Sequence, residues 1–151
     1  MKKLGLDVGT KTIGVAISDP TNLIAQAHNT IMRKNSKEDI NAVIQLIIDH
    51  DIDTVVIGLP KNMNNTIGPM GEKVMSFRNQ LNKKIMYSDR LKEKSVELVL
   101  WDERMTTMAA ERVLIEANVR RENRKKYIDN VAAQYILQGY LDLQNKEKLN
   151  G

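Results

Sequence analysis

The chain has 151 residues, of which 42% are hydrophobic and 4% aromatic, so it can form one domain with an aliphatic core. The absence of cysteine excludes disulfides, thiolate metal sites and cysteine nucleophiles. The net charge of +4 is mildly basic, and no apolar run reaches the ~18 residues of a membrane span. Asp7 and Gly9 interrupt the apolar start of the chain too early for a signal peptide. We therefore expect a cytoplasmic protein that does not associate with membranes.

The first 32 residues predict three consecutive strands. Residues 3–8 and 12–18 are rich in strand formers, and the GTKT stretch between them predicts a hairpin turn. Residues 23–32 follow a second turn and can supply a third strand. Short connections between consecutive strands favour an antiparallel meander.

The middle of the chain alternates helices with buried strands. Residues 36–50 carry apolar side chains at helical spacing, and residues 53–60 predict a short, fully buried strand. This order implies a crossover that places the buried strand parallel to a neighbour. Residues 61–68 predict a polar loop, and the helical pattern then runs from Pro69 to about Leu91.

The last third of the chain predicts one strand and two helices. A strand begins near residue 95 and leads into a loop, a helix follows over roughly 107–118, and a basic loop covers 120–126. A final helix is expected from about Tyr127 to Leu143, with a frayed tail over about 144–151. The whole order predicts a single α/β domain over 1–151, a mixed sheet with helices on both faces. Ligands of such sheets lie at the carboxyl ends of strands.

Several carboxylates follow or end predicted strands and can converge on one site. Asp7 lies near the end of the first strand, Asp102 and Glu103 end the last strand, and Asp129 lies in the first turn of the last helix. Close carboxylates repel unless a cation lies between them, and oxygen ligands suit Mg²⁺ or Mn²⁺. Two such ions ~4 Å apart can activate a water and stabilise the leaving oxygen of a phosphodiester.

Each carboxylate also has a structural interpretation. Asp7 could accept hydrogen bonds from turn amides, and Asp129 could interact with the dipole of its helix. Strand alternation places Asp102 and Glu103 on opposite faces, and it does not decide which of them faces the site.

Basic residues suggest a polyanionic partner. The RRENRKK stretch carries five cations and one anion, which matches the net charge of the whole chain. It can bind nucleic acid or be a solvated loop. Thr10 and Lys11 can contact phosphate or be ordinary turn residues, and Arg104 can hold phosphate, orient Glu103 or form a structural salt bridge. The cations of the basic stretch are Arg120, Arg121, Arg124, Lys125 and Lys126.

Four stretches in this order, GLDVGTKTIGVAISD, VVIGLPKNMN, WDERMTT and IDNVAAQYILQGYLD, resemble the YqgF or RuvX family of Holliday junction resolvases and pre-16S rRNA nucleases. The resemblance covers nearly the whole chain and implies an RNase H-like fold with a five-stranded mixed sheet. It also implies a divalent-metal nuclease with Asp7, Glu103 and Asp129 as catalytic and metal-binding residues, which favours Glu103 over Asp102. Residues 75–100 form a longer connection than the family usually has.

The resulting hypothesis is hydrolysis of an RNA phosphodiester in the 5′-end processing of pre-16S rRNA. One ion on Asp7 and Asp129 would activate water, and a second on Asp7 and Glu103 would stabilise the departing 3′ oxygen. Lys11, Arg104 and the basic stretch would bind the RNA backbone. Expected partners are structured RNA and ribosomal precursor particles, with the protein a monomer or homodimer.

Three alternatives remain open at this point. The same site could resolve branched DNA, which a homodimer would favour because two symmetric cuts need two sites. The chain could be a non-catalytic nucleic-acid-binding module. The DVGTKTIG stretch also resembles the phosphate-binding loop of actin-like kinases, which would require a second lobe.

Overall fold

The computed structural model describes residues 1–103 and 121–150, and for residues 121–130 and 150 it describes the backbone alone. The elements follow in the order β1 (Lys2–Val8), β2 (Thr12–Ser18), β3 (Ala25–Ala27), β4 (Ile31–Met32), α1 (Ser36–Asp49), β5 (Ile52–Leu59), α2 (Pro69–Tyr87), β6 (Glu97–Asp102) and α4 (Arg121–Asn150).

One mixed sheet organises these elements. Its strand order is β3-β2-β1-β5-β6, and β4 pairs with β2 beyond the end of β3. The β1–β2 pair is antiparallel, whereas β1–β5 and β5–β6 are parallel. The third strand expected over 23–32 is therefore divided into β3 and β4, which pair with different parts of the same neighbour. The predicted mixed sheet is confirmed: β3 and β4 together form the edge strand beside β2, and the other four strands are β2, β1, β5 and β6.

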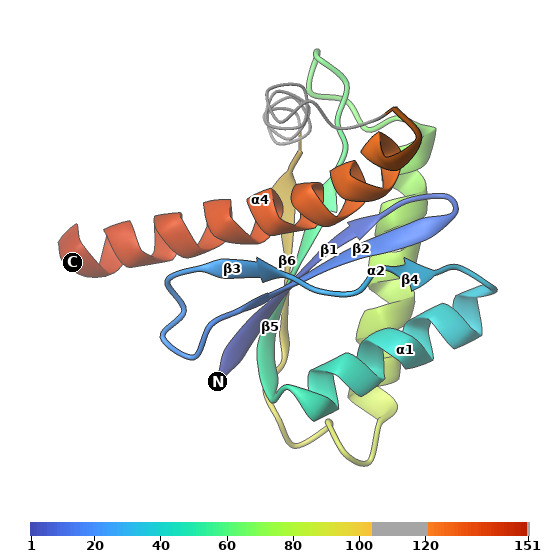
Figure 1. Ribbon diagram of the computed structural model, residues 1–151. Helices are drawn as coiled ribbons and strands as arrows, with labels where there is room; N and C mark the ends of the chain where they lie inside the picture. Colours follow the sequence, from blue (N-terminus) through green and yellow to red (C-terminus); the bar gives the residue numbers. More distant parts are fainter. Residues whose placement is uncertain (104–120, 151) are drawn as a thin grey trace.

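The two faces of the sheet are covered by different helices (Figure 1). On one face, α1 and α2 pack on aliphatic side chains that include Leu4, Leu6 and Ile57. On the other face, α4 runs across the sheet and packs on Ala16 and Val56. The predicted arrangement of helices on both faces is thus confirmed.

The α4 face is lined by small residues, which lets the helix approach the sheet closely. A Cβ added to Gly5 of β1 would lie 2.7 Å from Leu137 Cβ and 2.9 Å from the Ala133 carbonyl oxygen. Any side chain at position 5 would push α4 away, since such distances are shorter than van der Waals contact. This close approach leaves space for other side chains between α4 and the sheet only where the strands carry small residues.

Local sequence explains where the first two helices begin. Asn35 caps α1 because its Oδ1 accepts a hydrogen bond from the Glu38 N–H at 2.9 Å. Pro69 occupies the first turn of α2, as the sequence predicts. This helix ends at Tyr87 rather than near Leu91, and the long connection to β6 is held by the Leu91 side chain, which is 1% exposed.

The last helix is longer than the sequence predicts at both ends. Its backbone is helical from Arg121, so residues 121–126 form helix rather than the expected basic loop. The stretch contains no Gly or Pro and consists mainly of good helix formers, which explains the extension. The helix also continues to Asn150, where a frayed tail was expected from about 144. Here Asn145 Nδ2 donates to the Asn22 carbonyl oxygen at 3.1 Å.

The helix expected over 107–118 lies outside the described residues. None of the helices in residues 1–103 and 121–150 is long and apolar enough to cross a lipid bilayer.

Candidate active site

Asp7 lies on the α4 face of the sheet, near the carboxyl end of β1. It pairs with Gly14 of β2, and the parallel register that matches Leu6 to Ile57 places it beside Gly58 of β5. The Asp7 side chain shares its face with Gly5, which α4 covers, and it is half-buried. The charge in this strand is thus flanked by two glycines, which leave space for other groups next to the carboxylate.

Glu103 occupies the space over Gly58. Its N–H donates to the Leu59 carbonyl oxygen at 3.1 Å, which extends the β5–β6 pairing one residue past β6. A Cβ on Gly58 would lie 2.8 Å from both Cγ and Cδ of Glu103 and 2.5 Å from Ile136 Cδ1 of α4. The missing side chain at position 58 therefore lets the Glu103 carboxyl lie between the sheet and α4. Gly58 lies in the stretch 53–60 that the sequence predicts as a buried strand, and it was not among the predicted site residues.

Asp7 and Glu103 share a hydrogen bond in this buried space. The pKa of Glu103 is raised from 4.5 to about 9, mainly by burial and further by the hydrogen bond to Asp7 and by the negative charges of Asp7 and Asp102. Glu103 is 8% exposed, whereas Asp102 is exposed. The structure therefore decides the choice that strand alternation left open: Glu103, rather than Asp102, faces Asp7.

The third carboxylate, Asp129, is placed by the backbone of α4. The helix lies over Gly5 at Ala133, and Asp129 is one turn earlier on the same side. The later part of α4 contacts the β2–β3 connection, where Gln138 Nε2 donates to the Leu23 carbonyl oxygen at 2.9 Å. Its first turns lie toward the end of the sheet that carries the β1–β2 turn (Figure 1). The backbone position is compatible with convergence on Asp7, and contact of the side chains stays a prediction.

The start of α4 also corrects the structural interpretation of Asp129. Eight helical residues precede it, so it does not lie in the first turn. An interaction with the helix dipole weakens beyond the first turn and cannot explain an aspartate at this position.

The donor set fits a hard divalent cation. Among the described side chains no group of three or more His, Asp or Glu forms a metal cluster, and the pair that comes together is Asp7 and Glu103. These two carboxyl groups need a proton or a cation between them at neutral pH. Oxygen ligands with room for water and substrate oxygens suit Mg²⁺ or Mn²⁺.

The predicted phosphate-binding residues are partly at the same edge of the sheet. Thr10 and Lys11 are exposed in the β1–β2 turn, which the Gly9 N–H closes by donating to the Thr12 carbonyl oxygen at 2.8 Å. The predicted residues Arg121, Arg124, Lys125 and Lys126 lie in the first turns of α4, with backbone alone described, and Arg104 and Arg120 lie outside the described residues.

Arg33 holds the β1–β2 turn through a hydrogen bond, and the sequence analysis did not predict this role. Its Nη1 donates to the Gly9 carbonyl oxygen at 2.8 Å, and its Nε pairs with Asp39 Oδ2 at 3.0 Å. The Asp39 side chain is 2% exposed, so the pair is largely buried. A basic residue that precedes a helix with an acidic first turn was the only available signal, and it is common on protein surfaces.

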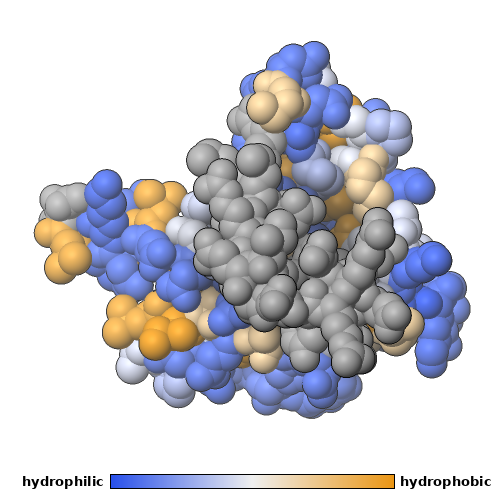
Figure 2. Space-filling model, turned by 45° about the horizontal axis from the view of Figure 1, so that its top comes forward, coloured by the Kyte–Doolittle hydropathy of each residue, from blue (hydrophilic) through white to orange (hydrophobic). Residues whose placement is uncertain are grey.

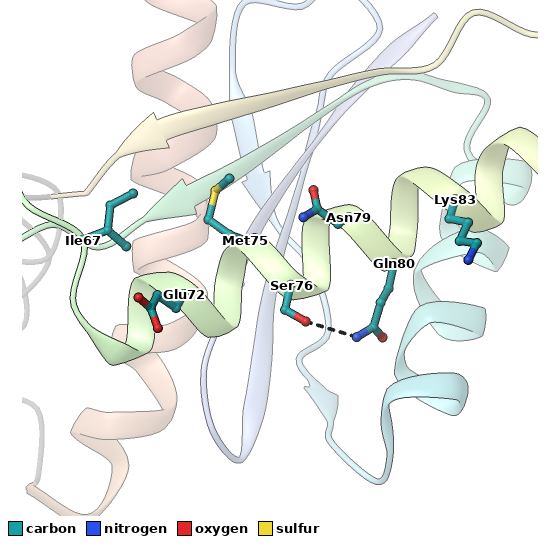
Figure 3. A pocket seen from close by; sticks show the side chains of 7 residues that line it. All are labelled: Ile67, Glu72, Met75, Ser76, Asn79, Gln80 and Lys83. Atoms are coloured by element: carbon teal, nitrogen blue, oxygen red, sulfur yellow. Dashed lines mark hydrogen bonds between the residues drawn. The ribbon is translucent and has the colours of Figure 1, made fainter.

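Another pocket lies away from these carboxylates. It has a volume of about 550 Å³ and follows α2, on the face opposite α4 (Figure 3). Its lining residues are Ile67, Glu72, Met75, Ser76, Asn79, Gln80 and Lys83. Glu72 is the one carboxylate among these residues, so this pocket offers no paired acids and is not the candidate active site.

Sequence comparisons connect the chain to one family. The family model described as "RuvX: Holliday junction resolvase" matches residues 1–143. A Clostridium botulinum (strain Hall) protein described as "Putative pre-16S rRNA nuclease" is 48% identical over 147 residues, which cover 97% of this chain and 100% of the relative. A Clostridium acetobutylicum protein of the same description is 49% identical over 142 residues, covering 94% and 98%.

Solved structures show the same fold at low sequence identity. Thermus thermophilus RuvC in complex with a Holliday junction substrate has a TM-score of 0.56 and 12% identity, covering 95% of each chain. The fowlpox virus Holliday junction resolvase has a TM-score of 0.54 and 16% identity, covering 94% of this chain and 99% of that one. These likenesses show the RNase H-like fold of the RuvC-type resolvases.

Proposed function

The chain belongs to the RuvX family, and from this premise we propose that it is a divalent-metal-dependent nuclease that hydrolyses RNA phosphodiesters in the 5′-end processing of pre-16S rRNA. Relatives named as pre-16S rRNA nucleases match it over their whole length at 48% identity. The observation that carries the chemistry is the buried Glu103 carboxyl held against Asp7 over Gly58. Two adjacent carboxylates are costly to bury without a cation, so a divalent ion that lies between them would be bound favourably, as a metal nuclease requires.

Asp7, Glu103 and Asp129 would hold Mg²⁺ or Mn²⁺. When bound, such a cation supplies a Lewis acid and lowers the pKa of a coordinated water. Glu103 must be ionised to act as a ligand, so a proton and a cation compete for the same space beside Asp7. The two strands give the carboxylates rigid mounts, and Ile136 of α4 shields the buried side of the pair from water.

The chain's other residues would position the nucleic acid. Thr10 and Lys11 lie exposed at the edge of the sheet next to Asp7, where backbone N–H groups and an ammonium group can hold a phosphate. The cations at the start of α4 would contact the phosphate backbone of the nucleic acid on the α4 side of the site. Hydrolysis would break the bond between phosphorus and the 3′ oxygen and leave a 5′-phosphate and a 3′-hydroxyl.

The family description favours a second candidate, the resolution of four-way DNA junctions. The same carboxylates could cleave either nucleic acid, and two symmetric cuts would require a homodimer. Loss of catalysis with retained binding is a third candidate. Processing of precursor rRNA would place the protein in the cytoplasm, with ribosomal precursor particles as partners.

Cleavage of a 5′-extended 16S rRNA precursor fragment, compared with a four-way DNA junction in Mg²⁺ or Mn²⁺ at low salt, tests the proposal. Wild type should cut the RNA, and Asp7→Asn and Glu103→Gln should be folded and inactive. Glu93→Gln, which removes an exposed carboxylate after α2, is the matched control and should cut normally. Cleavage of the junction alone would contradict the RNA assignment, and binding of RNA without turnover by wild type would indicate a binding module.

A further inference from the structure

Two adjoining clefts lie on the α1–α2 side of the molecule. The first, of about 330 Å³, lies between the β1–β2 turn and the starts of α1 and α2, where Thr10, Lys34 and Lys73 line it. The second, of about 410 Å³, lies between α1 and the second half of α2 and ends at Tyr87. Ser36 lines both clefts, so they adjoin each other at the start of α1. We call the two together the basic groove.

The charges of the basic groove are almost all positive. Among the described lining residues, six cations face one carboxylate, Asp39, which is buried and already paired with Arg33. The cations are Arg33, Lys34, Lys37, Lys73, Lys83 and Lys84. The whole chain has 23 Lys and Arg against 19 Asp and Glu, so the groove is far more basic than the average surface. A concave surface with this excess of positive charge complements a polyanion.

The far end of the groove carries an exposed aromatic side chain. Tyr87 is the last residue of α2 and is 74% exposed, next to Lys83 and Lys84. Figure 3 shows Gln80 and Lys83 on one side of α2, and both of these residues also line the second cleft together with residues of α1. Aromatic rings beside lysines are typical of surfaces that hold single-stranded nucleic acid, because bases stack on the ring while cations hold the phosphates.

The groove starts at the same edge of the sheet as the candidate active site, on the face opposite the Asp7 carboxylate. Thr10 lines its first cleft and lies three residues after Asp7, in the turn at the carboxyl end of β1. From there the groove leads away from the carboxylates, past the start of α1 and along α2. In Figure 2, orange hydrophobic residues lie among blue hydrophilic ones at the left, the side on which α4 ends in Figure 1.

We propose that the basic groove binds a single-stranded segment of the nucleic-acid substrate, continuous with the strand cut at Asp7 and Glu103. The phosphates would lie along the lysines from Lys34 to Lys84, and a base would stack on Tyr87. This inference rests on the proposed nuclease function, because it assigns the groove to that enzyme's substrate. It explains why positive charge gathers on the face opposite α4.

Fluorescence anisotropy with a labelled oligouridine RNA of about 20 nucleotides tests the groove at several salt concentrations. The double variant Lys37→Gln/Lys84→Gln should weaken binding and reduce the magnitude of the slope of log K against log salt by about 1.4, at about 0.7 per phosphate contact. Tyr87→Leu should weaken binding about 5- to 100-fold with an unchanged salt slope. All replaced side chains are exposed, so folding should be unaffected.

The matched control is the double variant Lys146→Gln/Lys148→Gln, which removes the same charge from the exposed C-terminal part of α4. If both double variants change affinity and salt slope equally, or if Tyr87→Leu binds as wild type does, the groove proposal is wrong. Preference for duplex RNA over the single strand would also overturn it.

The precursor-cleavage assay separates this proposal from the nuclease proposal. If wild type cleaves the precursor and the groove variants bind RNA as wild type does, the groove proposal is refuted and the nuclease proposal stands. Inactive wild type with weakened binding by the groove variants would refute the nuclease function and leave the groove as a binding site.

Discussion

Replacing Glu103 with glutamine should stabilise the metal-free protein at neutral pH and abolish its stabilisation by Mg²⁺. Glutamine keeps the shape of the side chain over Gly58 and can donate a hydrogen bond to Asp7 without first taking up a proton. Wild-type Glu103, in contrast, must be protonated beside Asp7 or be buried as a second negative charge.

The pKa of Glu103 sets the magnitude and the pH window. Its folded pKa of about 9 lies above the ordinary 4.5, so the folded state binds the proton more tightly than the unfolded state. The stability that this group contributes is complete below pH 4.5 and is lost as the pH rises toward about 9. At pH 7.5 the loss would reach ~4 kcal/mol at 1.36 kcal/mol per pH unit, and relaxation around the site should reduce it to ~1–3 kcal/mol.

Urea unfolding in EDTA at pH 4.5 and pH 7.5 measures this difference. Glu103→Gln and wild type should have similar stabilities at the lower pH, and the variant should be more stable at the higher pH. Addition of Mg²⁺ at ten times its Kd should then stabilise wild type by ~1.4 kcal/mol and leave the variant unchanged. The exposed control Glu93→Gln should follow wild type throughout. A variant that is less stable than wild type at pH 7.5 in EDTA would refute the argument from carboxyl repulsion.

Three further changes probe the surroundings of the site. Gly58→Ala adds a Cβ 2.8 Å from the Glu103 carboxyl carbon, so it should lower the cleavage rate more than tenfold and the free energy of unfolding by ~1–3 kcal/mol. Cleavage kinetics and urea unfolding measure the two effects, and a normal cleavage rate would contradict the packing argument. Asp102→Asn removes a charge that raises the pKa of Glu103, but this charge is exposed and therefore screened by water. The Mg²⁺ affinity measured by calorimetry should change by less than about threefold, and complete loss of binding would show that Asp102 is a ligand. Arg33→Met leaves Asp39 buried without its cation and should destabilise the protein by ~3 kcal/mol in urea, whereas an unchanged midpoint would show that the ion pair is dispensable.

Local patterns predicted most of the fold because each is decided by neighbours in the chain. The start of α1 follows from Asn35 and the apolar spacing after it, and β5 follows from a continuous apolar run. The ends of α4 were predicted less well. Residues 121–126 have no helix breaker, yet their charge suggested a loop, and the tail beyond 144 is held by the contact of Asn145 with Asn22, a residue far away in the chain.

The candidate residues of the site were available from the sequence, but their selection was not. Strand alternation shows that Asp102 and Glu103 point to opposite faces, and it cannot show which face carries Asp7 together with the covering helix. The structure supplies that information, because α4 packs over Gly5 and Gly58 and leaves the Glu103 carboxyl between them and the helix. The resemblance to a family had favoured the same residue, without a physical reason.

By itself, the sequence determined the mixed α/β order and the supply of carboxylates at strand ends without cysteine, and from these it predicted a site of oxygen ligands. These properties depend on residue types and on short-range periodicity. Only the tertiary structure decided that Gly58 makes room for Glu103, that Arg33 braces the β1–β2 turn, and that six cations line one groove. Three of these cations lie just before or at the start of α1, and the other three lie in α2. In the sequence, none of them differs from other surface cations. Their combined electrostatic field exists because packing α1 against α2 brings them within range of one another.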